Sequence, residues 1–542
     1  MKIHLVQANF HIGNFSEIRN KCIAEIELAK TKGADIVIFP EMAATGYPAL
    51  DLLTYPEFVS QAEELVLSLA KLSTDIAILI GGPETNKAPF GKQLYNSAYF
   101  LAEGKVMHVA RKMLLPTYDI FDEYRYFQPD NSPSVVQYKG LTIFISICED
   151  LWNEDTHNLY GKGPLDILLE SGQKIDLHLN IAASPFDPGQ KEKRAKVLLK
   201  NAQKGNCPVV YCNHTGTQTE LVFDGDCQVI YPSGESYNFP LFQEHSETIK
   251  IGDKKPKIES EKLIAIKHRA LVAGVKDYFG KLGFKKAILG LSGGIDSALT
   301  AHIAKEALGA ENVLGVLMPS QFSSGHSVDD AKKLAEILGI PTEIIPISGT
   351  YETIRKAMPT PFQESEFGLA EENIQARVRG LQLMAMSNKW GHVLLNTSNK
   401  SEIAVGYGTL YGDMCGGLSV IGDLYKTDVF EMCKWLNTEE EIIPWNTINK
   451  PPSAELRPDQ KDSDSLPDYA ILDHILQQYI EEKKGPKEII AQGFEPTVVA
   501  KTIALVNRNE FKRFQSAPIL RISKKAFGFG RRIPLVASPL TP

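Results

Sequence analysis

The stretch Gly290-Leu-Ser-Gly-Gly-Ile-Asp-Ser297 decides the fold of the second half of this 542-residue chain. It follows the short apolar run Ala287-Ile288-Leu289 and precedes residues 298–308, whose apolar side chains recur at helical spacing. A strand, a turn of Ser and Gly, and a helix start together predict a phosphate cradle. Glycine lets backbone N–H groups approach an anion, and the helix N-terminus adds unpaired donors.

The side chains of this loop add the chemistry. Ser292 and Ser297 supply hydroxyl donors, and Asp296 can hold a divalent cation beside the phosphates. No Lys follows the glycines, so the loop differs from the P-loop of kinases and ATPases. The alternative is a glycine-rich turn without a ligand. The loop resembles the Ser-Gly-Gly-x-Asp-Ser loop of N-type ATP pyrophosphatases, which implies cleavage of ATP to AMP and pyrophosphate.

Length and composition restrict the class of protein. A chain of 542 residues is expected to hold about two to four domains. The formal net charge of -8 argues against a nucleic-acid or membrane partner. The seven cysteines are scattered without a Cys-x-x-Cys pair, which argues against a zinc site. Without a signal-peptide pattern or a membrane-length apolar run, we expect a cytoplasmic protein with reduced thiols.

Hydrophobic patterns predict two α/β domains joined by a linker. Residues 1–242 alternate apolar, strand-like runs such as 35–39 and 141–147 with amphipathic helices, which predicts a layered domain. Residues 243–262 turn polar and rich in Lys and Glu, and we predict a linker there. The second domain is predicted to span residues 263–542.

Strands recur with helices between them in the second domain. They are predicted at residues 287–291, 313–318, 343–347 and 392–395. This spacing predicts a parallel, doubly wound sheet, in which ligands bind at the carboxyl ends of the strands. The glycine loop and Asn396-Thr397-Ser398 both fall at such ends. Two polar, proline-containing stretches, 359–372 and 450–467, are long enough to serve as mobile lids.

Three residues of the first domain form a candidate catalytic set. Glu41 and Cys148 each come just after an apolar run, and Lys112 lies in the segment Arg111-Lys112-Met113. A nucleophilic Cys needs a base and a cation that stabilises the oxyanion, and Glu41 and Lys112 fit these roles. Taken singly, Cys148 could be a small buried hydrophobe, Glu41 a helix cap and Lys112 a solvated side chain.

Together and in this order, the three resemble the nitrilase superfamily over roughly the first 240 residues. The resemblance implies an αββα sandwich and amide hydrolysis through a thioester. It also implies that Glu41 takes the thiol proton of Cys148 and later activates water. Lys112 and the backbone N–H of Glu149 would hold the oxyanion.

The resemblance also implies a glutamine-binding set. Tyr118 and Ser184 match positions that contact a glutamine substrate in the glutamine-dependent branch of the superfamily. A basic residue is expected shortly after Ser184. Gln190 stands at the aligned position and Lys191 follows it, so Lys191 is assigned as the third glutamine-binding residue.

A second candidate set follows the glycine loop. Adenylation of a carboxylate by ATP needs Mg²⁺ to bridge the phosphates and cations to offset developing charge. Asp296 and Glu402 are predicted metal ligands, and Lys426 is a predicted phosphate cation. The alternative is that Glu402 and Lys426 are surface residues and that Arg377 makes a surface salt bridge.

In order and spacing, this second set resembles that of ammonia- and glutamine-dependent NAD synthetases, and the resemblance covers almost the whole chain. It implies an adenine nucleotide alpha hydrolase-like second domain with Mg²⁺ as cofactor and ATP as co-substrate. The implied ATP-binding residues are Gly290, Leu291, Ser292, Gly293, Gly294, Ile295, Asp296, Ser297, Thr397, Lys426 and Ser453. The implied deamido-NAD-binding residues are Asn373, Arg377, Glu402 and Lys512. Leu410 and Gly417 depart from the ammonia-dependent branch, where a Lys and an Asp are expected.

This resemblance implies a reaction in which ATP adenylates deamido-NAD and glutamine-derived ammonia displaces AMP. The expected partners are deamido-NAD, ATP and L-glutamine, and we expect a homo-oligomer. One alternative is another ATP-pyrophosphatase amidotransferase that acts on a different acceptor. A second alternative is a nucleotide-sensing or scaffold protein without activity, which the presence of all the candidate catalytic residues disfavours.

Overall fold

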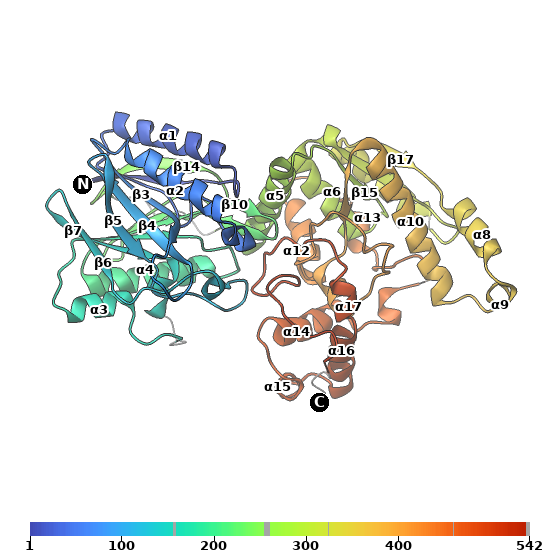
Figure 1. Ribbon diagram of the computed structural model, residues 1–542. Coiled ribbons are helices and arrows are strands. Elements are labelled where there is room, and N and C mark those ends of the chain that lie inside the picture. Colours follow the sequence, from blue (N-terminus) through green and yellow to red (C-terminus); the bar gives the residue numbers. More distant parts are fainter. Residues whose placement is uncertain (155–158, 254–260, 324, 459, 538–542) are drawn as a thin grey trace. The chain divides into compact units, whose positions relative to one another are not determined.

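The computed structural model describes residues 1–154, 159–253, 261–323, 325–458 and 460–537 (Figure 1). The chain divides into two compact units, Met1–Ser260 and Glu261–Pro542. Both units combine helices with sheets, as the sequence predicts. None of the described helices is both long and apolar enough to cross a membrane.

The first unit is built on two six-stranded sheets. One sheet has the order β14 (His245–Lys250), β1 (Lys2–Gln7), β2 (Ile36–Ile38), β3 (Ala77–Thr85), β4 (Leu94–Ala102) and β5 (Lys105–Arg111). The other has the order β13 (Ser236–Asn238), β12 (Gln228–Ile230), β9 (Val209–Asn213), β8 (Leu177–Ala182), β7 (Leu141–Ile147) and β6 (Ser134–Tyr138). A hairpin of β10 (Thr215–Gln218) and β11 (Leu221–Asp224) and helices α1 (Phe15–Thr31), α2 (Pro56–Ala70), α3 (Pro164–Glu170) and α4 (Gln190–Gly205) complete the unit.

Alternating side chains fix the layers of this unit. In β2, Ile36 and Ile38 join the buried cluster that lies between the two sheets, whereas Val37 joins the cluster formed with α1 and α2. In β7, Ile145 faces the same central cluster, and Phe144 packs with residues of α3. Because successive strand side chains point to opposite faces, each sheet buries one face against the other sheet and one against helices. The predicted αββα sandwich is therefore confirmed.

The predicted linker contains a strand. Residues 245–250 form β14, which pairs antiparallel with β1 from Lys2↔Lys250 to Gln7↔His245. β14 lies at the edge of its sheet, and only one of its six side chains is buried. Its polar composition therefore masked the strand in the sequence. The prediction that the linker begins at residue 243 was wrong on this point. Residues 254–260 of the predicted linker lie outside the described part of the chain.

The second unit has one five-stranded sheet in the order β17 (Thr342–Ile344), β16 (Val313–Leu317), β15 (Ala287–Gly290), β18 (Val393–Asn396) and β19 (Leu418–Ser419). Every pair of neighbours is parallel. The strand order reverses at β15, which confirms the doubly wound prediction and places the topological switch between β15 and β18.

Helices account for most of the rest of the second unit. They are α5 (Leu263–Leu282), α6 (Ile295–Leu308), α7 (Gly325–Leu338), α8 (Ser348–Ala357), α9 (Thr360–Gln363), α10 (Leu369–Trp390), α11 (Lys400–Val405), α12 (Lys426–Leu436), α13 (Trp445–Asn449), α14 (Tyr469–Ile480), α15 (Pro486–Ile490), α16 (Pro496–Arg508) and α17 (Glu510–Arg513). The stretch 359–372, predicted as a lid, contains α9 and the first turn of α10.

The central cluster of the first unit predicts a large loss of stability on truncation. Replacing the fully buried Leu179 by Ala should lower the free energy of unfolding of this unit by about 2–5 kcal/mol, because it leaves a cavity between the sheets. The measurement is urea unfolding followed by hydrogen exchange of peptides from β7 to β9. Leu67→Ala on α2, where the side chain is exposed, is the control and should change stability by less than about 0.5 kcal/mol.

Candidate active sites

Three strand ends bring together Glu41, Lys112 and Cys148 in the first unit. Glu41 lies three residues beyond β2, and Lys112 and Cys148 come directly after β5 and β7. All three side chains are buried. The Nζ of Lys112 lies 2.8 Å from Oε1 of Glu41, and the carboxylate is held further by Asn96, whose Nδ2 donates to the same oxygen at 2.7 Å. The predicted cation and base are therefore in direct contact.

Sequence reasoning missed a fourth member of this site, Glu123. It lies in the short 3₁₀ helix Glu123–Arg125, and its Oε2 is 2.8 Å from Lys112 Nζ. Tyr47 donates its hydroxyl to Glu123 at 3.0 Å. Although burial alone lowers the pKa of Lys112, the carboxylates of Glu123 and Glu41 raise it well above its usual value. Lys112 is therefore a permanent cation held between two carboxylates.

Cys148 lies close enough to Glu41 for the carboxylate to affect its thiol. Its backbone takes φ of +41°, which turns the chain sharply at the end of β7. Burial and the neighbouring Glu41 carboxylate raise the pKa of the thiol well above its usual value, so the resting group is the thiol. Among the described residues, Oε2 of Glu41 has no hydrogen-bond partner although it is buried. This oxygen is free to accept a proton.

Asp150 joins the loops that carry Cys148 and Lys112. Its Oδ2 accepts the backbone N–H of Ile147 at 2.9 Å, and its Oδ1 accepts those of Leu114 at 2.9 Å and Met113 at 3.1 Å. One buried carboxyl group thus fixes the residue before Cys148 and the residues after Lys112. The sequence places Asp150 beside the nucleophile but does not reveal this bridge.

Tyr118 and Glu149 form a pair beside Cys148. Tyr118 donates its hydroxyl to Oε2 of Glu149 at 2.8 Å. The ring of Tyr118 is 41% exposed, whereas Glu149 is buried. Burial raises the pKa of Glu149 to about 7. The predicted glutamine contact Tyr118 therefore reaches from solvent to the residue that follows the nucleophile.

Ser184 contacts the first residue of α4. Nε2 of Gln190 donates to Oγ of Ser184 at 3.2 Å, and the backbone N–H of Ser184 donates to Asn213 at 2.8 Å. Lys191 is half-buried, and its ammonium opposes the rise in the pKa of Asp226 that burial causes. Gln190 and Lys191 are the first two residues of α4, so their side chains leave the helix about 100° apart. Of these two residues, it is Gln190 that hydrogen-bonds to Ser184.

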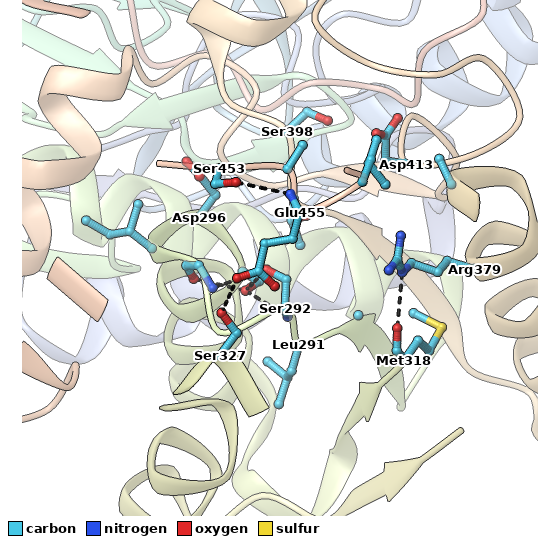
Figure 2. Close-up of a pocket in the computed structure, with 18 of the residues that line it drawn as sticks. Leu291, Ser292, Asp296, Met318, Ser327, Arg379, Ser398, Asp413, Ser453 and Glu455 are labelled. Atoms are coloured by element: carbon cyan, nitrogen blue, oxygen red, sulfur yellow. Dashed lines mark hydrogen bonds between the residues drawn. The ribbon is translucent and has the colours of Figure 1, made fainter. Parts of the chain in front are cut away.

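The second site is a cavity of about 320 Å³ at the carboxyl ends of β15 and β18 (Figure 2). It therefore lies at the topological switch point, at the carboxyl ends of the strands where ligand binding is predicted. The predicted ATP-binding residues that line it are Gly290, Leu291, Ser292, Gly294, Ile295, Asp296, Ser297, Thr397, Lys426 and Ser453. The predicted metal ligand Glu402 also lines it.

The glycine loop is closed by hydrogen bonds of its own hydroxyl groups. The hydroxyls of Ser292 and Ser297 lie 3.1 Å apart, and the backbone N–H of Gly294 donates to Oγ of Ser292 at 3.2 Å. Gly293 takes φ of +77°, and a Cβ built there would lie 2.2 Å from the carbonyl oxygen of Ser327. The loop therefore requires glycine at position 293, both for its backbone conformation and for its contact with α7.

A buried lysine lies between two carboxylates in the cavity. Nζ of Lys426 forms an ion pair with Asp296 and lies 3.4 Å from Oε1 of Glu402. Asn399 donates its Nδ2 to the other oxygen of Asp296 at 2.9 Å. Burial and the charge of Asp296 raise the pKa of Glu402 to about 8, which Lys426 opposes. The interpretation of Glu402 and Lys426 as surface residues was wrong.

The other predicted dinucleotide contacts gather around the segment 406–413. Asn373 accepts the hydroxyl of Thr409 at 2.7 Å, and Nε of Arg377 donates to the carbonyl of Leu410 at 3.2 Å. Lys512 donates to the carbonyls of Gly406 and Gly408, both at 2.8 Å. Within the described residues, none of the three lines the cavity. They form a cluster that supports this segment.

The structure explains one of the two departures from the family pattern in this region. A Cβ built on Gly417 would lie 2.8 Å from Cγ1 of Val393 in β18. This spacing is too short for the Asp expected at position 417 unless the Val393 side chain shifts. Leu410 contributes its backbone carbonyl to Arg377, a contact that any residue type could make.

Arg379 and Glu455 line the cavity and were missed in the sequence. Nε of Arg379 donates to the carbonyl of Met318 at 3.2 Å, and Ser327 donates its hydroxyl to Glu455 at 2.7 Å (Figure 2). Arg377 and Arg379 are two positions apart on α10, so they point about 200° apart. This difference explains why Arg377 is exposed and Arg379 faces the cavity. The positions of Arg377 and Arg379 around the helix were the sequence signal that could have identified Arg379.

Comparison with known proteins covers both units. The family model described as carbon-nitrogen hydrolase matches residues 2–253, and the one described as NAD synthase matches residues 267–516. The chain is 46% identical over 548 residues to a glutamine-dependent NAD(+) synthetase of Synechocystis sp., covering 98% of each chain. It is 38% identical over 584 residues to one of Thermotoga maritima, covering 99% of this chain and 98% of the relative.

Solved structures agree with these relatives. A glutamine-dependent NAD+ synthetase of Acinetobacter baumannii, determined in complex with ADP, matches with a TM-score of 0.78 at 38% identity and covers 99% of this chain and 98% of its own. One from Cytophaga hutchinsonii matches with a TM-score of 0.82 over the same shares at 21% identity, which supports the fold.

The raised pKa of Glu402 predicts a pH-dependent stability. A carboxyl group whose pKa is raised on folding stabilises the folded state below its unfolded pKa of 4.5 and loses this contribution as the pH rises through about 8. Glu402→Gln keeps a neutral side chain at every pH, so its melting temperature should rise relative to wild type between about pH 5 and 8.5. Thermal melts of the ligand-free proteins across this range test the prediction. A difference between the two melting temperatures that stays constant with pH would contradict it.

Proposed function

This chain belongs to the family of glutamine-dependent NAD(+) synthetases, and we propose which of its residues carry the two half-reactions of that activity. The enzyme is an ATP-dependent ligase that converts deamido-NAD, ATP, L-glutamine and water into NAD, AMP, diphosphate and L-glutamate. The observation that carries the residue assignment is the buried contact between Lys112 and Glu41, whose second oxygen is left without a partner next to Cys148.

We assign Cys148 as the nucleophile and Glu41 as the base of the glutaminase. Sγ of Cys148 attacks the amide carbon of glutamine while Oε2 of Glu41 takes the thiol proton. The same proton then goes to the leaving nitrogen, which departs as ammonia and leaves a thioester. Glu41 next takes a proton from water, whose oxygen attacks the thioester carbon. The C–S bond then breaks, glutamate leaves, and the proton returns from Glu41 to Sγ of Cys148. The free Oε2 and the protonated resting thiol support this order of events.

Lys112 and the backbone N–H of Glu149 are proposed to hold the oxyanion of the tetrahedral intermediate. The raised pKa of Lys112 supports this role, because it keeps the ammonium charged throughout the reaction. A fixed cation in a water-poor site stabilises developing negative charge far more than one in water. Asp150 is assigned as a positioning residue, since it ties the two loops together.

Tyr118, Ser184 and Lys191 are proposed to bind glutamine. The exposed ring of Tyr118 and its hydrogen bond to Glu149 support a place at the entrance to the nucleophile. Lys191 offers a cation for the carboxylate of glutamine near the start of α4. Gln190, which contacts Ser184, is added to this set as a hydrogen-bonding neighbour of the substrate.

The synthetase site is proposed to bind ATP through residues 290–297 with Thr397, Lys426 and Ser453. The nicotinate carboxylate attacks the α-phosphorus, diphosphate leaves, and ammonia then displaces AMP from the adenylate. Lys426 offsets negative charge that builds on the phosphates. Two carboxylates that face one ammonium offer hard oxygen ligands, so Asp296 and Glu402 fit Mg²⁺, which when bound would offset further phosphate charge.

Glu402 is also proposed to contact deamido-NAD from within the cavity. Asn373, Arg377 and Lys512, which hydrogen-bond to the segment 406–413, are proposed to contact deamido-NAD beside that segment. The hydrogen bonds of these three to that segment support a shared dinucleotide-binding wall.

We assign glutaminase activity to the predicted domain 1–242 together with β14, and synthetase activity to residues 263–542, with the boundary after β14. The division of the chain into Met1–Ser260 and Glu261–Pro542 supports this arrangement. A cytoplasmic location is proposed on the grounds that all seven cysteines are free. A homo-oligomeric state stays a prediction, which sedimentation would measure.

Replacing Cys148 by Ala should abolish NAD formation from glutamine and preserve NAD formation from ammonium, because only the glutaminase loses its nucleophile. Mass spectrometry of products formed from deamido-NAD, Mg-ATP and either nitrogen source measures both reactions. Cys207→Ala, which changes a buried cysteine packed near α3, is the control and should retain both. Glutamine-driven synthesis by the Cys148 variant would refute the nucleophile assignment.

Replacing Lys426 by Met should lower NAD formation from both nitrogen sources by about 10²–10³-fold, because one preorganised cation is lost from the phosphate site. The matched control is Lys434→Met, which removes an exposed charge from the same helix, α12. The initial rate of diphosphate release measures the effect. Equal loss in the two variants would place the effect on α12 as a whole rather than on the cavity.

A further inference from the structure

Three side chains of types that can bind a metal ion lie together on α5 and α6. Helix α6 is the one that begins in the glycine loop. The cluster consists of His268 on α5 and of His302 and Glu306, one turn apart on α6. The ligand atoms of the three lie within 4.8 Å of one another. The reaction proposed above assigns no role to any of them.

The spacing of these atoms matches a tetrahedral ligand shell. Nε2 of His268 lies 3.1 Å from Oε2 of Glu306, and Nε2 of His302 lies 3.7 Å from the same oxygen. Nitrogen and oxygen ligands at about 2.0–2.2 Å from a tetrahedral zinc ion stand roughly 3.3–3.6 Å apart. Small side-chain rotations therefore suffice to complete the shell.

Three of the four ring nitrogens of His268 and His302 have no hydrogen-bond partner among the described residues. Nε2 of His268 and both ring nitrogens of His302 are buried and make no hydrogen bond. The side chains are only 6% and 4% exposed. Unsatisfied buried polar atoms are unfavourable, and native structures rarely keep several together without a ligand. Nε2 of His268 and Nε2 of His302 lie near the Glu306 carboxylate without forming a hydrogen bond to it. Ligands of one shared ion have this arrangement.

The surroundings favour a neutral imidazole pair with an open side. The two imidazole rings lie 5.4 Å apart at 31°, and Trp435 packs on His268 at the same centroid distance. Burial lowers the pKa of His268 to about 4 and that of His302 to about 3, so both rings are neutral and able to bind metal at neutral pH. Glu306 is 40% exposed, which gives an ion access from solvent.

We propose that His268, His302 and Glu306 form a site for a divalent ion of the zinc class, with water as the fourth ligand. Two imidazoles and one carboxylate suit zinc rather than magnesium, which prefers oxygen ligands. The cysteine pattern that argued against zinc in the sequence does not bear on this site, because the site uses no cysteine. The ion joins α5 to the helix that carries the phosphate loop. The proposal is independent of the roles assigned in the NAD synthetase reaction.

The test is metal binding by the full chain without a polyhistidine tag, after removal of bound metal with a chelator. Equilibrium dialysis against Zn²⁺ in the presence of excess Mg²⁺, with elemental analysis, gives the stoichiometry. Titration with Co²⁺ gives an absorption spectrum that reports geometry and ligand type. We expect one ion per chain and a tetrahedral Co²⁺ spectrum that lacks thiolate charge-transfer bands.

Three variants locate the site. Glu306→Gln and His302→Gln should each weaken binding by more than about 10-fold, because each removes a ligand. Because Glu306 is partly exposed, we expect Glu306→Gln to fold. This variant therefore still tests the site if His302→Gln does not fold. The control is His474→Gln, which changes an exposed histidine on α14 and should leave binding unchanged. Zn²⁺ should raise the melting temperature of wild type and of the control more than that of Glu306→Gln.

Absence of stoichiometric binding by wild type would overturn the proposal. So would binding of equal strength in wild type and in Glu306→Gln. A Co²⁺ spectrum with thiolate bands would assign the ion to a cysteine, most simply Cys148, and would also overturn it. None of these results would alter the assignment of the two reaction sites.

Discussion

A buried ammonium that must be neutralised by two carboxylates organises each of the two reaction sites. Lys112 is 1% exposed and contacts Glu41 and Glu123, and Lys426 is 2% exposed and lies between Asp296 and Glu402. Removing one partner from a buried ion pair typically costs about 3–5 kcal/mol, because a charge is left uncompensated. Each lysine therefore fixes the positions of carboxylates that the chemistry requires.

These charges also connect separate parts of the chain. Glu41 and Lys112 follow different strands of one sheet, and Asp150 adds a bridge from Lys112 to the strand end of the second sheet that carries Cys148. In the second unit, Lys426 begins α12 and holds a residue from α6 and one from α11. Catalytic groups on rigid strand and helix ends need little reorganisation when charge develops, which is the main source of electrostatic catalysis.

The arrangement of one buried ammonium between two carboxylates also explains why each site favours a particular protonation state. The second carboxylate keeps Lys112 charged, and Oε2 of Glu41 has no hydrogen-bond partner, which suits it to the proposed role as acceptor of the thiol proton. In the cavity, one ammonium faces two carboxylates in a buried setting, and Glu402 responds with a raised pKa. A divalent cation at Asp296 and Glu402 would relieve this imbalance.

The resemblance to the nitrilase superfamily implied the αββα sandwich. The sequence by itself predicted the doubly wound sheet, the glycine loop and the candidate residues Glu41, Lys112, Cys148 and Lys426. These follow from patterns within a few residues, such as an apolar run that ends in a polar group, which report local structure directly. Only the tertiary structure decided the places of Glu123, Asp150, Gln190 and Arg379, and the pairing of β14 with β1. Their partners are remote in sequence or depend on helical phase, and His268 meets His302 and Glu306 only because α5 packs on α6. Such contacts arise from packing between elements, which no local pattern encodes.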